Sequence, residues 1–299
     1  MDTRVVDLGG PVHYIDFGGA DPPMVLVHGL GGAAINWLAV GPSLARRCRV
    51  LALDLLGFGR TPPIGGSCAL SVQRQLLDRF LREVVRAPAI LVGNSMGGLI
   101  AMQEAATEPG RVMGLILAAP AQPAPPGGRI DLEVLGEFLA YSMPWFGPWF
   151  LRRRSARLGP DGLVDDMLRL CCIDRSRVAP DLRAAHVALA AERMDHMPWA
   201  TSTFIGAARS TVAAVRRPRA FYRMAAKITA PCVVIQGTGD RLVPLAASRE
   251  LVRRRPDWSL EVIENTGHVP QLEDPERFLA ALGRWLDNAR LAAAARRPL

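Results

Sequence analysis

Apolar and polar positions alternate along the chain in blocks that predict strands and helices in turn. A weakly alternating stretch over residues 4–17, around Gly9-Gly10-Pro11, predicts a hairpin. Short apolar runs typical of strands buried on both faces follow over 24–28, 49–53, 89–92, 112–118, 232–236 and 259–263. Stretches with helical spacing separate them over 34–46, 71–86, 96–107, 246–254 and 275–288. The pattern predicts an α/β fold whose mostly parallel sheet carries helices on both faces.

This alternation stops in the middle of the chain. Prolines and glycines cluster over 120–128, and the segment that follows is prone to form helices. We expect a core domain formed by 1–119 and 226–299, with 120–225 as a helical lid, or cap, subdomain. The segment leaves and re-enters the sheet at the carboxyl ends of its strands, where ligands bind in such folds. That position favours a lid over a helical subdomain that only packs against the core.

A candidate nucleophile lies in the sequence Gly93-Asn94-Ser95-Met96-Gly97, between a predicted strand and a predicted helix. It matches the pattern G-x-S-x-G. A nucleophile on such a sharp turn takes a strained backbone conformation, and side chains two residues away on either side would clash, so glycines flank it. The turn would raise the Ser95 hydroxyl above the sheet, close to a helix N-terminus that favours negative charge.

A serine hydroxyl is a poor nucleophile unless a base removes its proton. Of the five histidines, His268 directly follows the last predicted strand, at the sheet edge where Ser95 is expected. The other four fall in the hairpin, at a strand end and in the lid. Asp240 lies in a glycine-rich loop after the strand over 232–236, and we expect it to orient the imidazole. Ser95, Asp240 and His268 are the predicted catalytic triad.

An oxyanion intermediate needs two N–H donors. One is expected to be the backbone amide of Met96, the residue after the nucleophile. The other is expected from the loop His28-Gly29-Leu30-Gly31-Gly32, at Leu30.

Together these segments resemble the α/β-hydrolase fold family, in its serine-nucleophile branch. The resemblance rests on His28-Gly29, on Asp54 with Gly57-Phe58-Gly59-Arg60, on the turn at Ser95, and on Asp240 and Gly267-His268. It implies the α/β-hydrolase fold: a mostly parallel eight-stranded sheet with helices on both faces and a helical lid inserted after the sixth strand. It also implies hydrolysis through a Ser-His-Asp triad, with Asp54 as a structural residue.

The resemblance leaves the substrate open. Ser95, where other branches have a carboxylate, disfavours haloalkane dehalogenases and epoxide hydrolases. The segment 93–96 is similar to hydrolases that cut a C–C bond in meta-cleavage products, but these commonly have Trp where this chain has Val269. The segment 267–273 is similar to esterases and lipases. The main expectation is a hydrolase of carboxylic esters with an apolar acyl or alcohol group. The alternatives are a C–C hydrolase, a cofactor-free perhydrolase, a slow receptor-like hydrolase and an inactive scaffold.

An aromatic-rich segment of the lid, over 138–151, is followed by Arg152-Arg153-Arg154. Its aromatic side chains either pack the lid onto the core or form a hydrophobic acyl pocket with an edge suited to a lipid–water interface. The candidate substrate-binding residues are Gly29, Asn94, Trp145, Phe146 and Val269.

Composition and net charge limit the class of protein and the partners that it can have. Of 299 residues, 49% are apolar and 21% charged, which is typical of a folded globular protein. The net charge is +8, but the basic residues are dispersed, which predicts no nucleic-acid binding. The same charge permits weak peripheral contact with an anionic membrane. A monomer and a homodimer both remain open.

We expect a cytoplasmic protein without metal or organic cofactor. The spacing of the five cysteines is not that of a metal site, and we expect them to be reduced thiols. His186, Asp195 and His196 have no third ligand at a suitable spacing. The N-terminus lacks the pattern of a signal peptide, and no run approaches the ~20 apolar residues of a membrane span.

Overall fold

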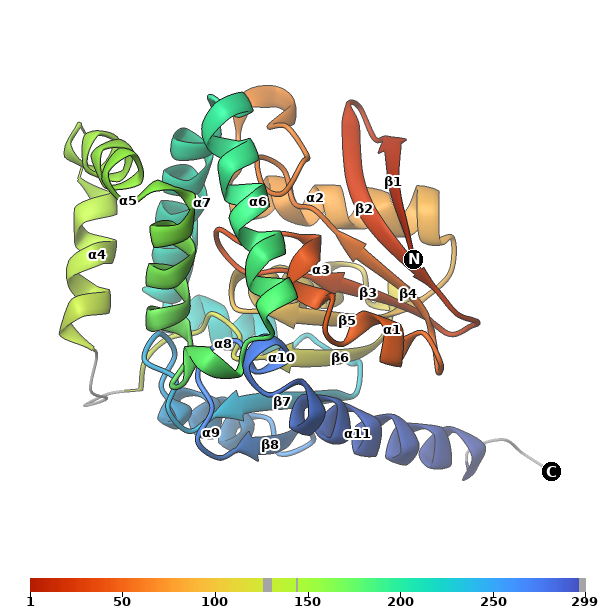
Figure 1. Cartoon of the computed structure of the whole chain (residues 1–299). Coiled ribbons are helices and arrows are strands. Elements are labelled where there is room, and N and C mark those ends of the chain that lie inside the picture. Colours follow the sequence, from red (N-terminus) through yellow and green to blue (C-terminus); the bar gives the residue numbers. More distant parts are fainter. Residues whose placement is uncertain (126–130, 144, 296–299) are drawn as a thin grey trace.

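The computed structural model describes residues 1–125, 131–143 and 145–295. Its centre is an eight-stranded sheet with the strand order β1-β2-β4-β3-β5-β6-β7-β8 (Figure 1). The predicted hairpin consists of β1 (Asp2–Asp7) and β2 (Pro11–Gly18), which is antiparallel to both of its neighbours. All other pairs are parallel. These strands are β3 (Pro23–Val27), β4 (Arg49–Leu53), β5 (Ala89–Asn94), β6 (Val112–Ala118), β7 (Cys232–Gly237) and β8 (Ser259–Ile263).

Helices cover both faces of this sheet, which explains why its inner strands are apolar without interruption. In β5, Ile90 and Val92 belong to the apolar cluster under α11 (Pro275–Ala295), while Leu91 belongs to the cluster on the other face. That second face carries α2 (Leu70–Phe80), α3 (Met96–Thr107) and α9 (Leu245–Arg254). The predicted sheet and its two helical layers are confirmed.

One predicted helix is wrong. Over 34–46 the structure has a 3-10 turn, η1 (Ala34–Trp37), and a separate short helix, α1 (Gly41–Leu44). Pro42 has no N–H to donate, so it is tolerated in the first turn of α1 but would interrupt a single helix over 34–46. Trp37 is nevertheless fully buried, as the apolar spacing predicts.

A block of helices is inserted between β6 and β7, after the sixth strand as predicted. It begins with α4 (Leu132–Ser142) and α5 (Phe146–Cys171), which is kinked at Gly159-Pro160. After the 3-10 turn η5 (Arg175–Arg177) come α6 (Pro180–His196) and α7 (Ala200–Val215). We call α4 to α7 the inserted helices; they lie beside the sheet at its left in Figure 1. Residues 126–128 of the proline-glycine cluster lie outside the described part of the chain.

The lid was predicted to run to residue 225, a range whose last helix also packs against the core. Phe221 and Ala225 of α8 (Pro218–Ala225) are buried in the same cluster as the side chains of α3 and β7. α8 thus packs against α3 as well as against α7.

Within the described ranges, no helix is long and apolar enough to cross a membrane. The five cysteines are free thiols, and burial raises the pKa of Cys68 to about 11.

The packing of α11 gives a first prediction. Phe278 is fully buried, with its ring centroid 6.4 Å from that of Trp37. Phe278→Ala is expected to lower the free energy of unfolding by about 3–5 kcal/mol, because it leaves a cavity in the core. Urea denaturation followed by circular dichroism would measure it, with exposed Val5→Ala as the control, expected to change stability by about 0.5 kcal/mol or less. A loss as small as the control's would contradict this packing.

Candidate active site

The turn at Ser95 has the strained geometry that the sequence predicts. Ser95 has φ 52° and ψ −119°, a conformation that side chains rarely adopt. A Cβ on Gly97 would lie 2.2 Å from the carbonyl oxygen of Val27, and one on Gly93 would lie 2.5 Å from that of Gly97. Both positions therefore require glycine. Between residues 91 and 100, Ser95 alone is not buried, so the turn presents this hydroxyl at the end of β5.

His268 and Asp240 lie side by side after β8 and β7. The His268 Nδ1 is 2.8 Å from Oδ2 of Asp240. The same oxygen accepts the Nε2–H of Gln236 at 2.8 Å, and Oδ1 accepts the amides of Leu242 and Val243. A carboxylate surrounded by donors is an acceptor, so Nδ1 of His268 carries the proton. The Nε2 atom is buried, and no atom of the described chain forms a hydrogen bond with it.

The backbone around His268 is held by three further contacts. The His268 amide donates to the carbonyl oxygen of Cys171 at 2.6 Å, and the Gly267 amide donates to Oε2 of Glu273 at 2.7 Å. A Cβ on Gly267 would lie 2.2 Å from that Cys171 oxygen, which explains the glycine before the histidine. The Asn94 Nδ2 donates to the His268 carbonyl at 3.1 Å. Asn94 was predicted to bind substrate; in the structure its side-chain amide positions the histidine turn.

The loop after β3 is fixed by His28. Its Nε2 accepts the Leu55 amide at 3.1 Å, so Nδ1 carries the proton and donates to the Gly29 carbonyl at 2.7 Å. The Gly32 amide donates to the same carbonyl at 3.1 Å. Burial lowers the pKa of His28 to about 4, although Asp54 opposes that shift. The neutral imidazole thus holds the segment from which the Leu30 amide was predicted to act.

Asp54 has the structural role that the sequence predicts. Its Oδ2 lies 2.5 Å from Nδ1 of His13 and accepts the Arg60 amide, and its Oδ1 accepts the Ala34 amide at 2.6 Å. Burial opposes ionisation, but the hydrogen bond with His13, together with the nearby imidazoles and the Ala34 amide, outweighs it and lowers the pKa of Asp54. The carboxylate joins β2, η1 and the loop after β4.

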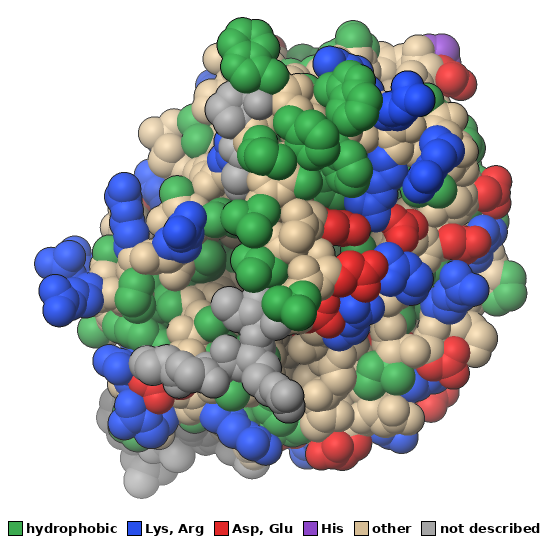
Figure 2. All heavy atoms as spheres, turned by 90° about the vertical axis from the view of Figure 1, so that its left-hand side faces the viewer, with side chains coloured by type: hydrophobic (Ala, Val, Ile, Leu, Met, Phe, Trp, Pro, Cys, Tyr) green, Lys and Arg blue, Asp and Glu red, His purple; other side chains and the backbone are tan. Residues whose placement is uncertain are grey.

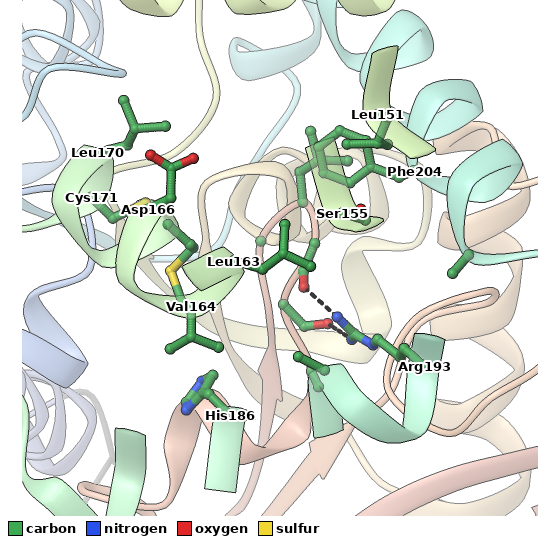
Figure 3. Close-up of a pocket in the computed structure, with 18 of the residues that line it drawn as sticks. Leu151, Ser155, Leu163, Val164, Asp166, Leu170, Cys171, His186, Arg193 and Phe204 are labelled. Atoms are coloured by element: carbon green, nitrogen blue, oxygen red, sulfur yellow. Dashed lines mark hydrogen bonds between the residues drawn. The ribbon is translucent and has the colours of Figure 1, made fainter. Parts of the chain in front are cut away.

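A cationic side chain from α6 reaches the same loop. The Arg193 guanidinium donates to the carbonyl oxygens of Gly31 and Gly32 at 2.8 and 2.7 Å, shown as dashed lines in Figure 3. Both acceptors are neutral, and burial lowers the pKa of Arg193. Through Arg193 the inserted helices therefore hold the loop in place. The guanidinium keeps its positive charge at the site, because both carbonyl groups are neutral.

These residues surround a cavity of about 610 Å³ between the inserted helices and the carboxyl ends of the strands. Ser95 and His268 both line it, as do Gly29, Leu30, Asn94 and Val269, which the sequence placed at the site. Met96 is fully buried as the first residue of α3. Much of the remaining wall is apolar, contributed for example by Leu151, Leu163, Val164 and Phe204 (Figure 3).

Two predicted substrate-binding residues lie elsewhere. Trp145 and Phe146 are absent from the cavity wall and have 91% and 40% of their surface exposed. The reason is the register of α4, which turns Val134, Glu137 and Tyr141 toward the cavity and ends before Trp145. The assignment of these two aromatic side chains to the pocket is wrong.

The cavity also contains a polar cluster that the sequence did not predict. Arg154 donates to Tyr141 Oη at 2.7 Å and to Glu137 at 2.9 Å, and it also pairs with Asp166. Burial, followed by the charge of Glu137, raises the pKa of Tyr141 to about 12. Two carboxylates thus neutralise Arg154, in contrast to Arg193.

His186 lines the cavity with its Nδ1 2.8 Å from the Leu182 carbonyl oxygen. Across the described ranges, no three or more His, Cys, Asp or Glu side chains gather as a metal site would require.

The state of His28 gives a second prediction. Its pKa is about 4 in the folded protein and 6.5 as an ordinary value, so the unfolded chain binds one more proton between these pH values. Stability present above pH 6.5 is therefore lost as the pH falls toward 4, by about 1.4 kcal/mol per pH unit. His28→Gln should flatten this dependence in urea titrations at several pH values. The exposed His196→Gln should keep it, and equal slopes for wild type and His28→Gln would refute the assignment.

Comparisons with known proteins agree with this architecture. A model of the alpha/beta hydrolase family matches residues 24–281. A 2-hydroxy-6-oxononadienedioate/2-hydroxy-6-oxononatrienedioate hydrolase of Paraburkholderia xenovorans is 29% identical over 92% of this chain and 91% of its own length. The structure of a membrane phospholipase A, a bacterial virulence factor, has a TM-score of 0.73 and 26% identity over 97% of this chain and 86% of that one.

A meta-cleavage product hydrolase from Pseudomonas fluorescens IP01 also has a TM-score of 0.73, with 22% identity over 97% of this chain and 98% of that one. Relatives with different substrates thus share one fold with this protein. The chain belongs to the alpha/beta hydrolase family and is a hydrolase.

Proposed function

We propose that the protein hydrolyses carboxylic esters with an apolar acyl or alcohol group. Ser95 is the nucleophile, His268 the general base, and Asp240 the residue that orients the base. The observation that carries this proposal is the state of His268. Its Nδ1 is bound to Asp240, while its buried Nε2 has no partner in the described chain, beside a cavity that Ser95 also lines.

The reaction then takes two steps. Nε2 of His268 takes the proton of the Ser95 hydroxyl as its oxygen attacks the ester carbonyl, and the proton passes to the leaving alcohol. This leaves an acyl group on Ser95. Water attacks that acyl group by the same route and releases the acid. The carboxylate of Asp240 stabilises the imidazolium that forms in each step.

The amides of Leu30 and Met96 are proposed to stabilise the oxyanion. Met96 is the first residue of α3, and amides in the first turn of a helix have no partner within the helix. The helix dipole adds positive potential at this end. His28 and Arg193 hold the carbonyl groups of the opposite loop, which favours a fixed orientation of the Leu30 amide.

The substrate class follows from the cavity wall. Apolar side chains from α5 and α7 favour an acyl or alcohol chain without charge. The likeness to a membrane phospholipase A supports an ester with a long apolar chain. We propose that the inserted helices act as a lid, because α4 to α7 all contribute to this wall.

A third prediction tests the nucleophile. Ser95→Ala is expected to lower the turnover of p-nitrophenyl esters by about three orders of magnitude or more, as for other triad nucleophiles. The series runs from acetate to palmitate, and its optimum reports the length of the pocket. Ser155→Ala is the matched control, because Ser155 lines the same cavity and is not a member of the proposed triad.

Equal losses in the two variants would remove Ser95 from its proposed role. A burst of nitrophenol with little steady turnover in the wild type would instead support the receptor-like alternative.

A second candidate is C–C bond hydrolysis. The relative from Paraburkholderia is named for a dienedioate substrate, which carries two carboxylates. Arg193 supplies a positive charge at the cavity whose hydrogen-bond acceptors are both neutral, and such a charge suits a carboxylate. Ser95 and His268 would serve this reaction too, since the bond that breaks is also next to a carbonyl.

The fourth prediction separates the candidates through Arg193. If a substrate carboxylate binds this side chain, Arg193→Gln raises KM for a 2-hydroxy-6-oxodienoate by about tenfold or more, since an ion pair is lost. The KM for a neutral ester of similar size should change much less. Steady-state kinetics on both substrates would measure the difference. Equal changes for both would assign Arg193 only to holding the loop and would count against the C–C candidate.

A further inference from the structure

The outer face of the inserted helices carries a group of exposed apolar side chains, visible as a cluster of hydrophobic atoms in Figure 2. Its members lie on α4, in the turn after it, and in the first two turns of α5. They are Leu132, Leu135, Leu139, Met143, Trp145, Phe146 and Trp149. We call this group the α4–α5 patch. Contiguous exposed patches of this kind mark interaction sites rather than ordinary surface.

Helix α4 is apolar on two opposite faces. Val134 and Tyr141 are buried and line the cavity. Leu132, Leu135 and Leu139, spaced as i, i+3 and i+7, share the other face and are exposed. A helix that only covers the cavity needs one apolar stripe. The second stripe therefore needs a different explanation.

The turn between α4 and α5 carries a second unusual feature. Trp145 is 91% exposed and has φ 67°, a backbone conformation that side chains rarely adopt. Neither packing nor backbone preference accounts for a tryptophan at this position. Phe146 and Trp149 lie next to each other, with ring centroids 5.6 Å apart, so the exposed aromatic rings form one surface.

Arginines border this surface on α5. Arg152, Arg153 and Arg157 are exposed, and no carboxylate of the described residues pairs with them. The Arg153 guanidinium lies over the Trp149 ring at 5.8 Å. Tryptophan and leucine beside unpaired arginines fit an interface whose inner part is apolar and whose surface is anionic.

We propose that the α4–α5 patch docks on the surface of an anionic lipid bilayer. Its apolar side chains enter the region of the headgroups and upper acyl chains, and the three arginines contact lipid phosphates. A second copy of this chain is a less suitable partner for the α4–α5 patch than a bilayer. A symmetric dimer through the patch would bring the same arginines of both copies together, without acidic partners. Arg152 also lines the cavity, so docking brings the cavity close to the bilayer.

The experiment is co-sedimentation with vesicles of phosphatidylcholine, alone or mixed with phosphatidylglycerol. The full chain is compared with Leu132→Ser/Trp145→Ser, which removes the two most exposed side chains of the patch. The matched control is Val5→Ser/Met113→Ser, two exposed apolar side chains on β1 and β6. We expect the patch variant to bind mixed vesicles about tenfold more weakly or worse, and the control to bind like wild type.

A second pair of substitutions tests the charge. Arg153→Glu/Arg157→Glu should weaken binding to mixed vesicles and leave the weaker binding to pure phosphatidylcholine unchanged. Added salt should likewise weaken only binding to mixed vesicles. Circular dichroism and thermal melting check that each variant is folded. Because the readout is binding, its result is independent of whether the protein cleaves esters.

Three outcomes would overturn the proposal. One is an absence of wild-type binding to either vesicle. Another is equal binding by the patch variant and the control. The third is a dimer in sedimentation velocity without lipid that Leu132→Ser/Trp145→Ser converts to a monomer, which would assign the patch to contact between copies of the chain.

Discussion

The backbone at His268 is fixed by four parts of the chain at once. Its amide is bound to the end of α5 and its carbonyl to Asn94, beside the serine. Its ring is bound to Asp240, and the preceding amide to Glu273. No single element could place an imidazole this closely, because loops are otherwise the most variable part of such a fold. Since α5 supplies one of these contacts, displacement of the inserted helices would disturb the histidine as well as the cavity wall.

The sequence predicted the sheet and the proposed triad because each depends on local pattern. Buried parallel strands are continuously apolar, and Ser95 stands in a glycine-flanked turn that few other structures require. The prediction of one helix over 34–46 was wrong for a local reason too. It gave more weight to the apolar spacing of this segment than to the effect of Pro42. The prediction that Trp145 and Phe146 line the pocket was wrong because aromatic composition does not reveal which face of a helix contacts the cavity.

Other parts of the site could not be predicted from local pattern. Arg193 acts on a loop that lies 161 and 162 residues before it in the sequence, and nothing around it distinguishes it from other charged residues in helices. Gln236 did carry a signal. It is a polar residue at the end of an apolar strand, fully buried, and such a side chain must find hydrogen-bond partners. Its partner is the Asp240 carboxylate, so the strand itself helps to orient the proposed acid.

Charged side chains of the inserted helices contact the active-site loops in two ways, as ion pairs and as a cation bound to neutral carbonyl groups. At the start of α4, Asp131 and Glu133 bind Arg241, the neighbour of Asp240, at 2.8 and 2.7 Å. These ion pairs are partly exposed, so each contributes little alone. Arg193 differs, because it is bound to neutral carbonyl groups and keeps its positive charge within the cavity wall. An ester without charge gains nothing from this cation beyond a rigid loop, whereas a carboxylate would gain an ion pair. Arg193 holds the loop in the same way whichever substrate binds. The choice between a neutral ester and a carboxylate substrate therefore depends on whether its charge also binds the substrate.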